Sequence, residues 1–251
     1  MPKFVDVAKG SRHSIGVTAD GRAFSWGTNT SLGQLGRDDE EIPAREPGEI
    51  PFPDDVVVQR AYVSNSEKDS GHSAIVDSKG RLWMAGCDRW QQLGLGSANA
   101  GSAGYTWIGG KLWQDRFVLS PFVDEVVKQD DTSMAIRDVS LGADHTLVLA
   151  SNGHDVYGFG KGGDGQLGFV GKPFVSAPKK SKVLSQPGTA AVCAVQHCSL
   201  TLGHKGEVKQ KVGRRCNSNE VQEGITRCIQ RAQRHGLLSH SEALKEQELV
   251  S

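Results

Sequence analysis

A repeated set of histidines and glycines constrains the fold of this chain more than any other feature. Three segments can be aligned on His13, His72 and His145. Each then has a glycine eight residues later, a second glycine six or seven residues after that, and a closing Gln-Leu-Gly. A fourth, weaker copy has Cys198 at the histidine position and lacks the Gln-Leu-Gly. Landmarks that recur at near-constant offsets identify an internal repeat, which predicts an architecture of stacked, similar units.

Each unit has the pattern of a β-hairpin. In the first copy Ile15 and Val17 alternate with polar or small residues, as in a half-buried strand, and Asp20-Gly21 supplies a tight turn. The returning strand carries a large aromatic residue, for example Trp83 in the second copy. A single hairpin cannot bury such side chains, so neighbouring units must pack on one another as the blades of a β-propeller do.

Together, the motifs G-x-x-H-S/T, D/N-G, W/F-G and G-Q-L-G resemble the repeat of the regulator of chromosome condensation (RCC1) family. The resemblance extends over roughly residues 4–213 and is most specific at 9–36, 70–96 and 139–168. It implies an all-β, RCC1-type β-propeller, of which about four blades are recognisable here against the usual seven. It also implies that the three repeat histidines are structural residues that tie loops together rather than catalysts.

Two insertions interrupt the repeats. Residues 38–56 are acidic and proline-rich, which indicates a solvated surface loop. Residues 97–121 are rich in aromatic side chains, and a binding loop of this kind would present Trp107, Trp113 and Arg116 to a protein partner. The alternative is a hairpin of the next blade, turning at a Gly-Gly pair. The two interpretations are compatible.

After the repeats, the pattern of strands and turns gives way to a helical one. We therefore divide the chain into RCC1-like repeats at residues 1–212 and a helical C-terminal tail at 213–251. Asn219 is a candidate helix N-cap, and Gly236 fits a C-cap. The apolar face of this helix consists of Val221, Ile225, Ile229 and Ala232. Ser239 and Glu242 resemble a capping box for a short second helix.

Three arginines form a basic stripe on the predicted tail helix, namely Arg227, Arg231 and Arg234. Such a stripe could contact an acidic partner protein, nucleic-acid phosphate or an anionic surface. Alternatively, it is the solvated face of a helix that packs on the repeats.

Composition narrows the function classes. Lys and Arg total 29, as do Asp and Glu, so the net charge of zero favours no class of partner. Five scattered cysteines without a C-x-x-C predict no disulfide framework and a reducing compartment. The group Cys193, His197, Cys198 and His204 does not have the spacing of zinc ligands, so we expect no metal.

The N-terminus has no pattern of a targeting signal, and no apolar run is long enough for a membrane span. We therefore expect no membrane insertion and an intracellular protein of the cytoplasm or nucleus, with an organelle left open. An arc of four blades exposes a blade flank, which favours association with a partner or a second copy.

We find no catalytic set, P-loop or dinucleotide motif, and so expect neither enzyme activity nor a cofactor. The sequence predicts a non-catalytic protein-interaction scaffold, a subunit of a larger assembly. Two alternatives stay open. The resemblance implies a guanine-nucleotide exchange factor for a Ran-like small GTPase, which requires a complete propeller face and a β-wedge that only residues 97–117 could supply. The arginine stripe alone favours a chromatin or nucleic-acid-associated protein.

Overall fold

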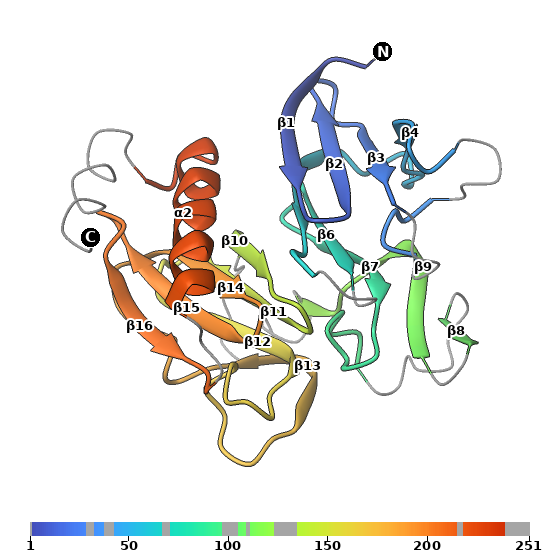
Figure 1. Cartoon of the computed structure of the whole chain (residues 1–251). Helices are drawn as coiled ribbons and strands as arrows, with labels where there is room; N and C mark the ends of the chain where they lie inside the picture. Colours follow the sequence, from blue (N-terminus) through green and yellow to red (C-terminus); the bar gives the residue numbers. More distant parts are fainter. Residues whose placement is uncertain are drawn as a thin grey trace.

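The computed structural model describes residues 2–28, 33–37, 43–66, 71–96, 105–108, 111–122, 135–214 and 218–238. These residues form strands β1 to β16 and helix α2 (Figure 1). The strands pair into four separate antiparallel sheets that follow one another along the chain. This arrangement confirms the predicted four-bladed, RCC1-type propeller with a C-terminal helix.

The blades are numbered 1 to 4, and their strands are given in spatial order. Blade 1 comprises β1 (Phe4–Lys9), β2 (His13–Thr18), β3 (Ala23–Gly27) and β4 (Gly48–Glu49). Blade 2 comprises β5 (Val58–Val63), β6 (His72–Asp77), β7 (Leu82–Cys87), β9 (Lys111–Leu119) and β8 (Tyr105–Ile108). Blade 3 comprises β10 (Ile136–Leu141), β11 (His145–Ala150), β12 (Val156–Lys161) and β13 (Phe174–Lys180). Blade 4 comprises β14 (Thr189–Val195), β15 (Cys198–Gly203) and β16 (Val208–Val212).

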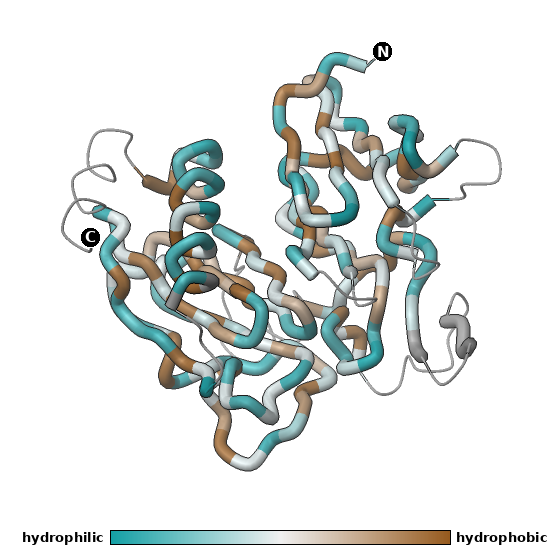
Figure 2. The backbone as a smooth tube through the Cα atoms, viewed as in Figure 1, coloured by the Kyte–Doolittle hydropathy of each residue, from teal (hydrophilic) through white to brown (hydrophobic). Residues whose placement is uncertain are grey.

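The first strand of each blade faces a shared axis, because β1, β5, β10 and β14 contact one another in that order. Each joint between neighbouring blades has its own hydrophobic cluster. Ile15 and Trp83 belong to the cluster between blades 1 and 2, and Met84 and Phe159 to the one between blades 2 and 3. Hydrophobic segments accordingly run along the strands in Figure 2. Blade-on-blade stacking is therefore what buries the aromatic residue of each repeat.

Helix α2 (Ser218–Arg234) covers the outer flank of blade 4. Its residues Val221, Ile229 and Ala232 share a hydrophobic cluster with Cys193 and Leu200 of that blade. The expectation of an open flank is therefore wrong for blade 4, because the helix takes the position that a further blade would occupy. Terminal caps of this kind stabilise repeat proteins.

The helix ends as the sequence predicts. Gly236 has a φ of 68°, and the N–H of Leu237 donates to the carbonyl of Ala232 at 2.7 Å, as in a glycine C-cap. At the other end, α2 begins at Ser218, next to the predicted cap Asn219. Strand β16 ends at Val212, the predicted domain boundary, which remains a prediction. The predicted second helix at Ser239–Glu242 lies outside the described residues.

A disulfide joins Cys193 of β14 to Cys228 of α2, with their Cα atoms 5.7 Å apart. The sequence analysis predicted no disulfide framework, so this bond was not expected. Their sequence separation is 35 residues, and only the packing of α2 on β14 brings them together. The bond fixes the helix covalently to the blade that it caps.

Each Gln-Leu-Gly loop packs against the following blade. A Cβ on Gly94 would lie 2.5 Å from the Cδ2 atom of Phe159, a residue of blade 3, and Gly94 also has a φ of +65°. Leu93 beside it is fully buried. The glycine is thus required both by the backbone and by the contact between blades.

We expect Gly94→Ala to lower the free energy of unfolding by about 2–3 kcal/mol, because it adds a clash to the strain of a left-handed backbone. Gly96→Ala is the matched control: its φ is +78°, but a Cβ there meets nothing within 4 Å. It should cost only the backbone part, about 1 kcal/mol. Urea denaturation of both variants provides the measurement. Equal losses would contradict the loop-to-blade contact.

Candidate functional site

The repeat histidines connect neighbouring blades. The Nε2 of His13 in blade 1 lies 2.7 Å from the Oγ of Ser73 in blade 2. That hydroxyl donates in turn to the carbonyl oxygen of Gln34, at 2.7 Å, in the Gln-Leu-Gly loop of blade 1. The Ser73 oxygen therefore accepts the Nε2–H, which identifies the tautomer of the neutral imidazole.

The same arrangement recurs at the next joints. His72 Nε2 lies 3.1 Å from Thr146 Oγ1, which donates to the carbonyl of Gln92 at 2.8 Å. His145 Nε2 lies 2.9 Å from Ser199 Oγ in blade 4. Each histidine thus reaches the hydroxyl residue that follows the histidine position of the next repeat.

Burial keeps the imidazoles of His13 and His145 neutral. It lowers the pKa of His13 to about 4, and that of His145 to about 3, the latter with smaller contributions from the neighbouring His72 and His197. Both side chains are almost wholly enclosed. This geometry confirms their predicted structural role.

The aromatic insertion is a hairpin, as in one of the two interpretations from the sequence, but it belongs to blade 2 and not to the next blade. Strands β8 and β9 pair antiparallel and extend blade 2 to five strands. Trp113 is 7 % exposed and packs on Cys87, so it is a core residue, and its assignment to a partner-facing surface is corrected. Arg116 is exposed on β9. Trp107 lies in β8, and its side chain is outside the described part of the structure.

Arg231 of the basic stripe points inward. Its Nη2 lies 2.8 Å from Oδ2 of Asp138, a fully buried residue of β10, and donates to the carbonyl of Val192 at 2.6 Å. Its Nη1 is 3.1 Å from the Ser140 hydroxyl. The side chain thus ties α2 to blades 3 and 4, which corrects its assignment to the partner-facing set.

Arg234 and His235 connect the helix to blade 1. Arg234 Nη1 lies 3.0 Å from Oδ1 of Asp6 and also donates to the carbonyl of Val7. His235 Nε2 is 3.3 Å from Oδ2 of Asp6. Burial by itself would raise the pKa of Asp6, but the hydrogen bonds and charges of His235 and Arg234 lower it. Helix α2 therefore joins the first blade of the arc to the last.

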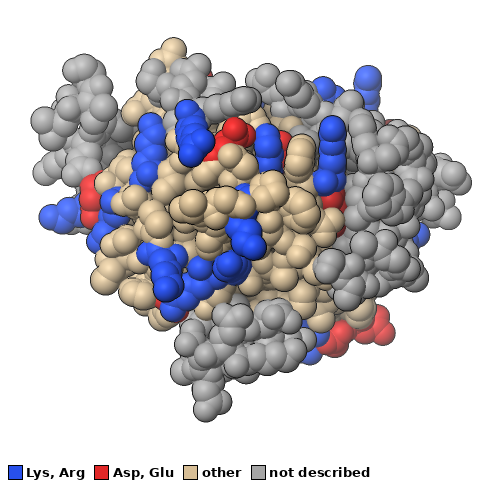
Figure 3. All heavy atoms as spheres, turned by 90° about the horizontal axis from the view of Figure 1, so that it is seen from below, with Lys and Arg blue, Asp and Glu red and all other residues tan. Residues whose placement is uncertain are grey.

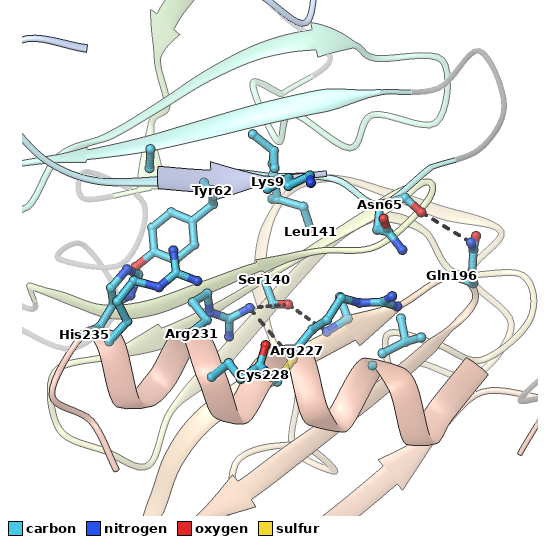
Figure 4. Close-up of a pocket in the computed structure, with 18 residues that line it drawn as sticks. Lys9, Tyr62, Asn65, Ser140, Leu141, Gln196, Arg227, Cys228, Arg231 and His235 are labelled. Atoms are coloured by element: carbon cyan, nitrogen blue, oxygen red, sulfur yellow. Dashed lines mark hydrogen bonds between the residues drawn. The ribbon is translucent and has the colours of Figure 1, made fainter. Parts of the chain in front are cut away.

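Between the helix and the inner strands lies a cavity of about 230 Å³, which we call the axial pocket (Figure 4). Its walls come from β1, the β5 region, β10, the end of β14, and α2. Arg227, Lys9, Asn65 and Gln196 are among its lining residues. It is the place where all four blades and the helix meet.

No sequence pattern indicates the pocket's other residues. Lys9, Tyr62 and Asn65 stand singly on or after inner strands, outside every repeat motif. One signal existed at Gln196: the fourth repeat turns with Gln196-His197 between paired Val195 and Cys198, where no glycine is available. Gln196 accordingly has a φ of 46°. Its Nε2 donates to the carbonyl of Asn65 at 3.3 Å, across the axis.

The described residues include neither a cluster placed to bind a metal ion nor a helix that could span a membrane. No group of three His, Cys, Asp or Glu side chains there is placed to hold a metal ion, and Cys193 of the suspected zinc set is in the disulfide. None of the helices that the structure describes has the length and apolar character to span a bilayer.

Comparison with known proteins agrees with this geometry. A family model, the regulator of chromosome condensation (RCC1) repeat, matches residues 4–34 and 136–166. The Protein RCC2 homolog of Danio rerio is 30 % identical over 210 residues, which cover 80 % of this chain and 40 % of the relative. Human Protein RCC2 is 29 % identical, with 80 % and 38 % covered. The chain thus spans about two-fifths of the length of these relatives.

Solved structures show the same fold. Prp20p from Saccharomyces cerevisiae superposes with a TM-score of 0.58 at 18 % identity, covering 90 % of this chain and 47 % of Prp20p. Human WBSCR16 gives a TM-score of 0.59 at 21 % identity, with 82 % and 46 % covered. The repeat motifs, the family-model match and the relatives agree, and the chain is therefore built from repeats of the regulator of chromosome condensation (RCC1) type.

Proposed function

We propose that this chain is a non-catalytic protein-interaction scaffold that presents a partner-binding surface on the β8–β9 hairpin. One observation carries the proposal: blade 2 has five strands, whereas the other described blades have three or four. The polar groups that recur in the repeats are used for joining blades. The extra hairpin is not needed for that purpose, and an addition to a rigid blade is a typical place for binding.

The relatives support a protein partner. Prp20p was reported with its binding properties to Gsp1p and histones, and yeast RCC1 (Prp20) with bound Kap60. Because this chain spans only part of its relatives, their partners are candidates here rather than assignments. On the face seen in Figure 3, Lys and Arg side chains outnumber those of Asp and Glu. A basic face favours an acidic partner surface.

We expect Arg116→Glu to reduce the recovery of the main partner at least fivefold, because reversing an exposed interface charge opposes association. The tagged chain and the variant are isolated from their own cells, and the proteins bound to each are quantified by mass spectrometry. Lys182→Glu is the matched control, since Lys182 is equally exposed but lies after blade 3. Arg227 and Arg234 serve as further positions for the same test of the basic stripe.

The outcomes separate the candidate functions. A fixed set of proteins lost only from Arg116→Glu supports the scaffold with this hairpin as its surface. A small GTPase enriched after removal of nucleotide with a Mg²⁺ chelator favours the exchange-factor alternative. Histones or nucleic acid lost at high salt favour the chromatin alternative. Equal recovery with both variants would contradict the hairpin as the partner surface.

A further inference from the structure

We propose that the axial pocket is a binding site for a small anion that carries a phosphate group. This site is separate from the hairpin surface, and the inference does not depend on the proposed function. It rests on the charge of the pocket wall, on buried polar atoms that lack partners, and on the arrangement of hydrogen-bond donors around the cavity.

The first argument is the sign of the charge. No Asp or Glu is among the pocket's lining residues, whereas five basic residues are: Lys9, Arg227, Arg231, Arg234 and His235. Two carboxylates lie behind the wall, where Asp138 pairs with Arg231, and Asp6 pairs with Arg234 and His235. These pairs leave Lys9 and Arg227 as the charges that face the cavity.

Neither of these two residues is neutralised by a buried acid. Arg227 is 3.5 Å from Glu223, but the side chain of that glutamate is 73 % exposed. Within the described residues, Lys9 has no carboxylate partner. Exposed ion pairs contribute little, so an incoming anion can displace Glu223 at small cost. The wall of the cavity therefore carries positive charge that no buried carboxylate neutralises.

The second argument comes from buried atoms in the same wall. The Tyr62 hydroxyl, the Nε of Arg231 and the Nδ1 of His235 are enclosed and have no hydrogen-bond partner among the residues that the structure describes. Tyr62 is 3 % exposed, and the His235 side chain 4 %. A buried donor without an acceptor costs about 1–3 kcal/mol. Two of the three atoms are O–H and N–H donors, and a small shift of these side chains toward the cavity would bring them to the acceptor oxygens of an occupant.

The third argument is the arrangement of donors. In Figure 4, Arg227 and Lys9 extend over the same end of the pocket as the amides of Asn65 and Gln196. Guanidinium, ammonium and amide N–H groups around one cavity match phosphate oxygens, which accept several charge-assisted hydrogen bonds at once. The volume of about 230 Å³ also far exceeds what one water molecule needs.

A ligand in this position would contact α2 and the inner strands of all four blades. It would bind the closed arc and not the unfolded chain, so it must raise the thermal stability, and the rise must grow with the logarithm of its concentration. We therefore use pyrophosphate and inorganic phosphate as the test anions for the full chain, with sodium chloride at matched ionic strength as reference.

The expected result is a rise in Tm with pyrophosphate that sodium chloride does not produce. The double variant Lys9→Gln/Arg227→Gln should bind pyrophosphate at least tenfold more weakly, whereas Lys182→Gln/Lys211→Gln, two exposed lysines elsewhere, should bind it within twofold of the parent. Lys9 and Arg227 do not pair with the carboxylates of Asp138 and Asp6 that lie behind the pocket wall. Both double variants should therefore fold with the parent's Tm in the absence of anion.

A second measurement locates the ligand. The NMR signal of the Arg231 Nε–H should move during titration with pyrophosphate in the parent and stay in place in the Lys9→Gln/Arg227→Gln variant. The proposal is overturned if neither anion raises Tm beyond the salt reference. It is equally overturned if both double variants respond alike, since the effect then arises from charge elsewhere on the surface.

Discussion

Arg231→Met lowers the free energy of unfolding by about 3–5 kcal/mol, the cost of leaving one partner of a buried ion pair without the other. Asp138 is fully buried, and its Oδ2 has the Arg231 guanidinium at 2.8 Å. The backbone N–H of Val192, which also donates to Oδ2 at 3.1 Å, cannot neutralise the charge. The methionine keeps the length and the apolar part of the side chain, so the loss reports the guanidinium with its contacts to Asp138, Val192 and Ser140. Urea denaturation at pH 7 measures it.

Two comparisons make this result specific. Arg227→Met lies one turn earlier on α2, at a side chain that is 45 % exposed, and should change the stability by less than about 0.5 kcal/mol. Arg231→Met combined with Asp138→Asn removes the orphaned charge and should regain a large part of the loss. If the single Arg231 variant were as stable as the Arg227 variant, the clamp on Asp138 would not hold α2 in place.

Acidification should weaken the protein well above the range in which carboxylates titrate. In the folded state the pKa values of His13 and His145 are about 4 and about 3, below the ordinary value of 6.5. Between pH 6.5 and these lower pKa values the unfolded chain binds more protons than the folded one, so stability falls as the pH falls. Their contribution is complete above pH 6.5 and is lost progressively below it. Each histidine adds a slope of about 1.4 kcal/mol per pH unit.

The measurement is the free energy of unfolding at pH 7.0, 6.0, 5.0 and 4.5. The variant His13→Gln/His145→Gln keeps an N–H donor at each joint but does not titrate, so its stability should vary much less over this range. His204→Gln, at an exposed turn of blade 4, is the control and should keep the steep dependence. A parent profile that is flat down to pH 4.5 would contradict neutral, enclosed histidines.

The blades could be predicted from sequence because each one is encoded locally. Alternation along Ile15 and Val17, the Asp20-Gly21 turn and the Gln-Leu-Gly loop lie within one short segment, and the structure repeats that segment as a hairpin with its loop. The role of the histidines followed from the same regularity. A motif that recurs at every contact between blades is more simply explained by a role in joining the blades than by catalysis.

The position of α2 could not be predicted in this way. The stripe of three arginines is visible in the sequence, but the acids that Arg231 and Arg234 select, Asp138 and Asp6, precede them by 93 and 228 residues. No pattern within a short segment of the sequence indicates such a pairing. The disulfide and the axial pocket depend on the same long-range packing, so neither could be predicted from the sequence. Trp113 was wrongly assigned to a surface because a binding loop and a buried strand can have the same pattern of aromatic residues.

The bridge from α2 back to β1 also sets an order of events during synthesis. Each blade, with its local hairpins, can form as soon as its own segment and the next have left the ribosome. The contacts of Arg234 and His235 with Asp6 must wait until all four blades have been made. Such distant contacts are slow to form. Until α2 has docked, the nascent arc exposes the flank of blade 4 that the helix later covers. We expect the need for a chaperone to be greatest at this stage.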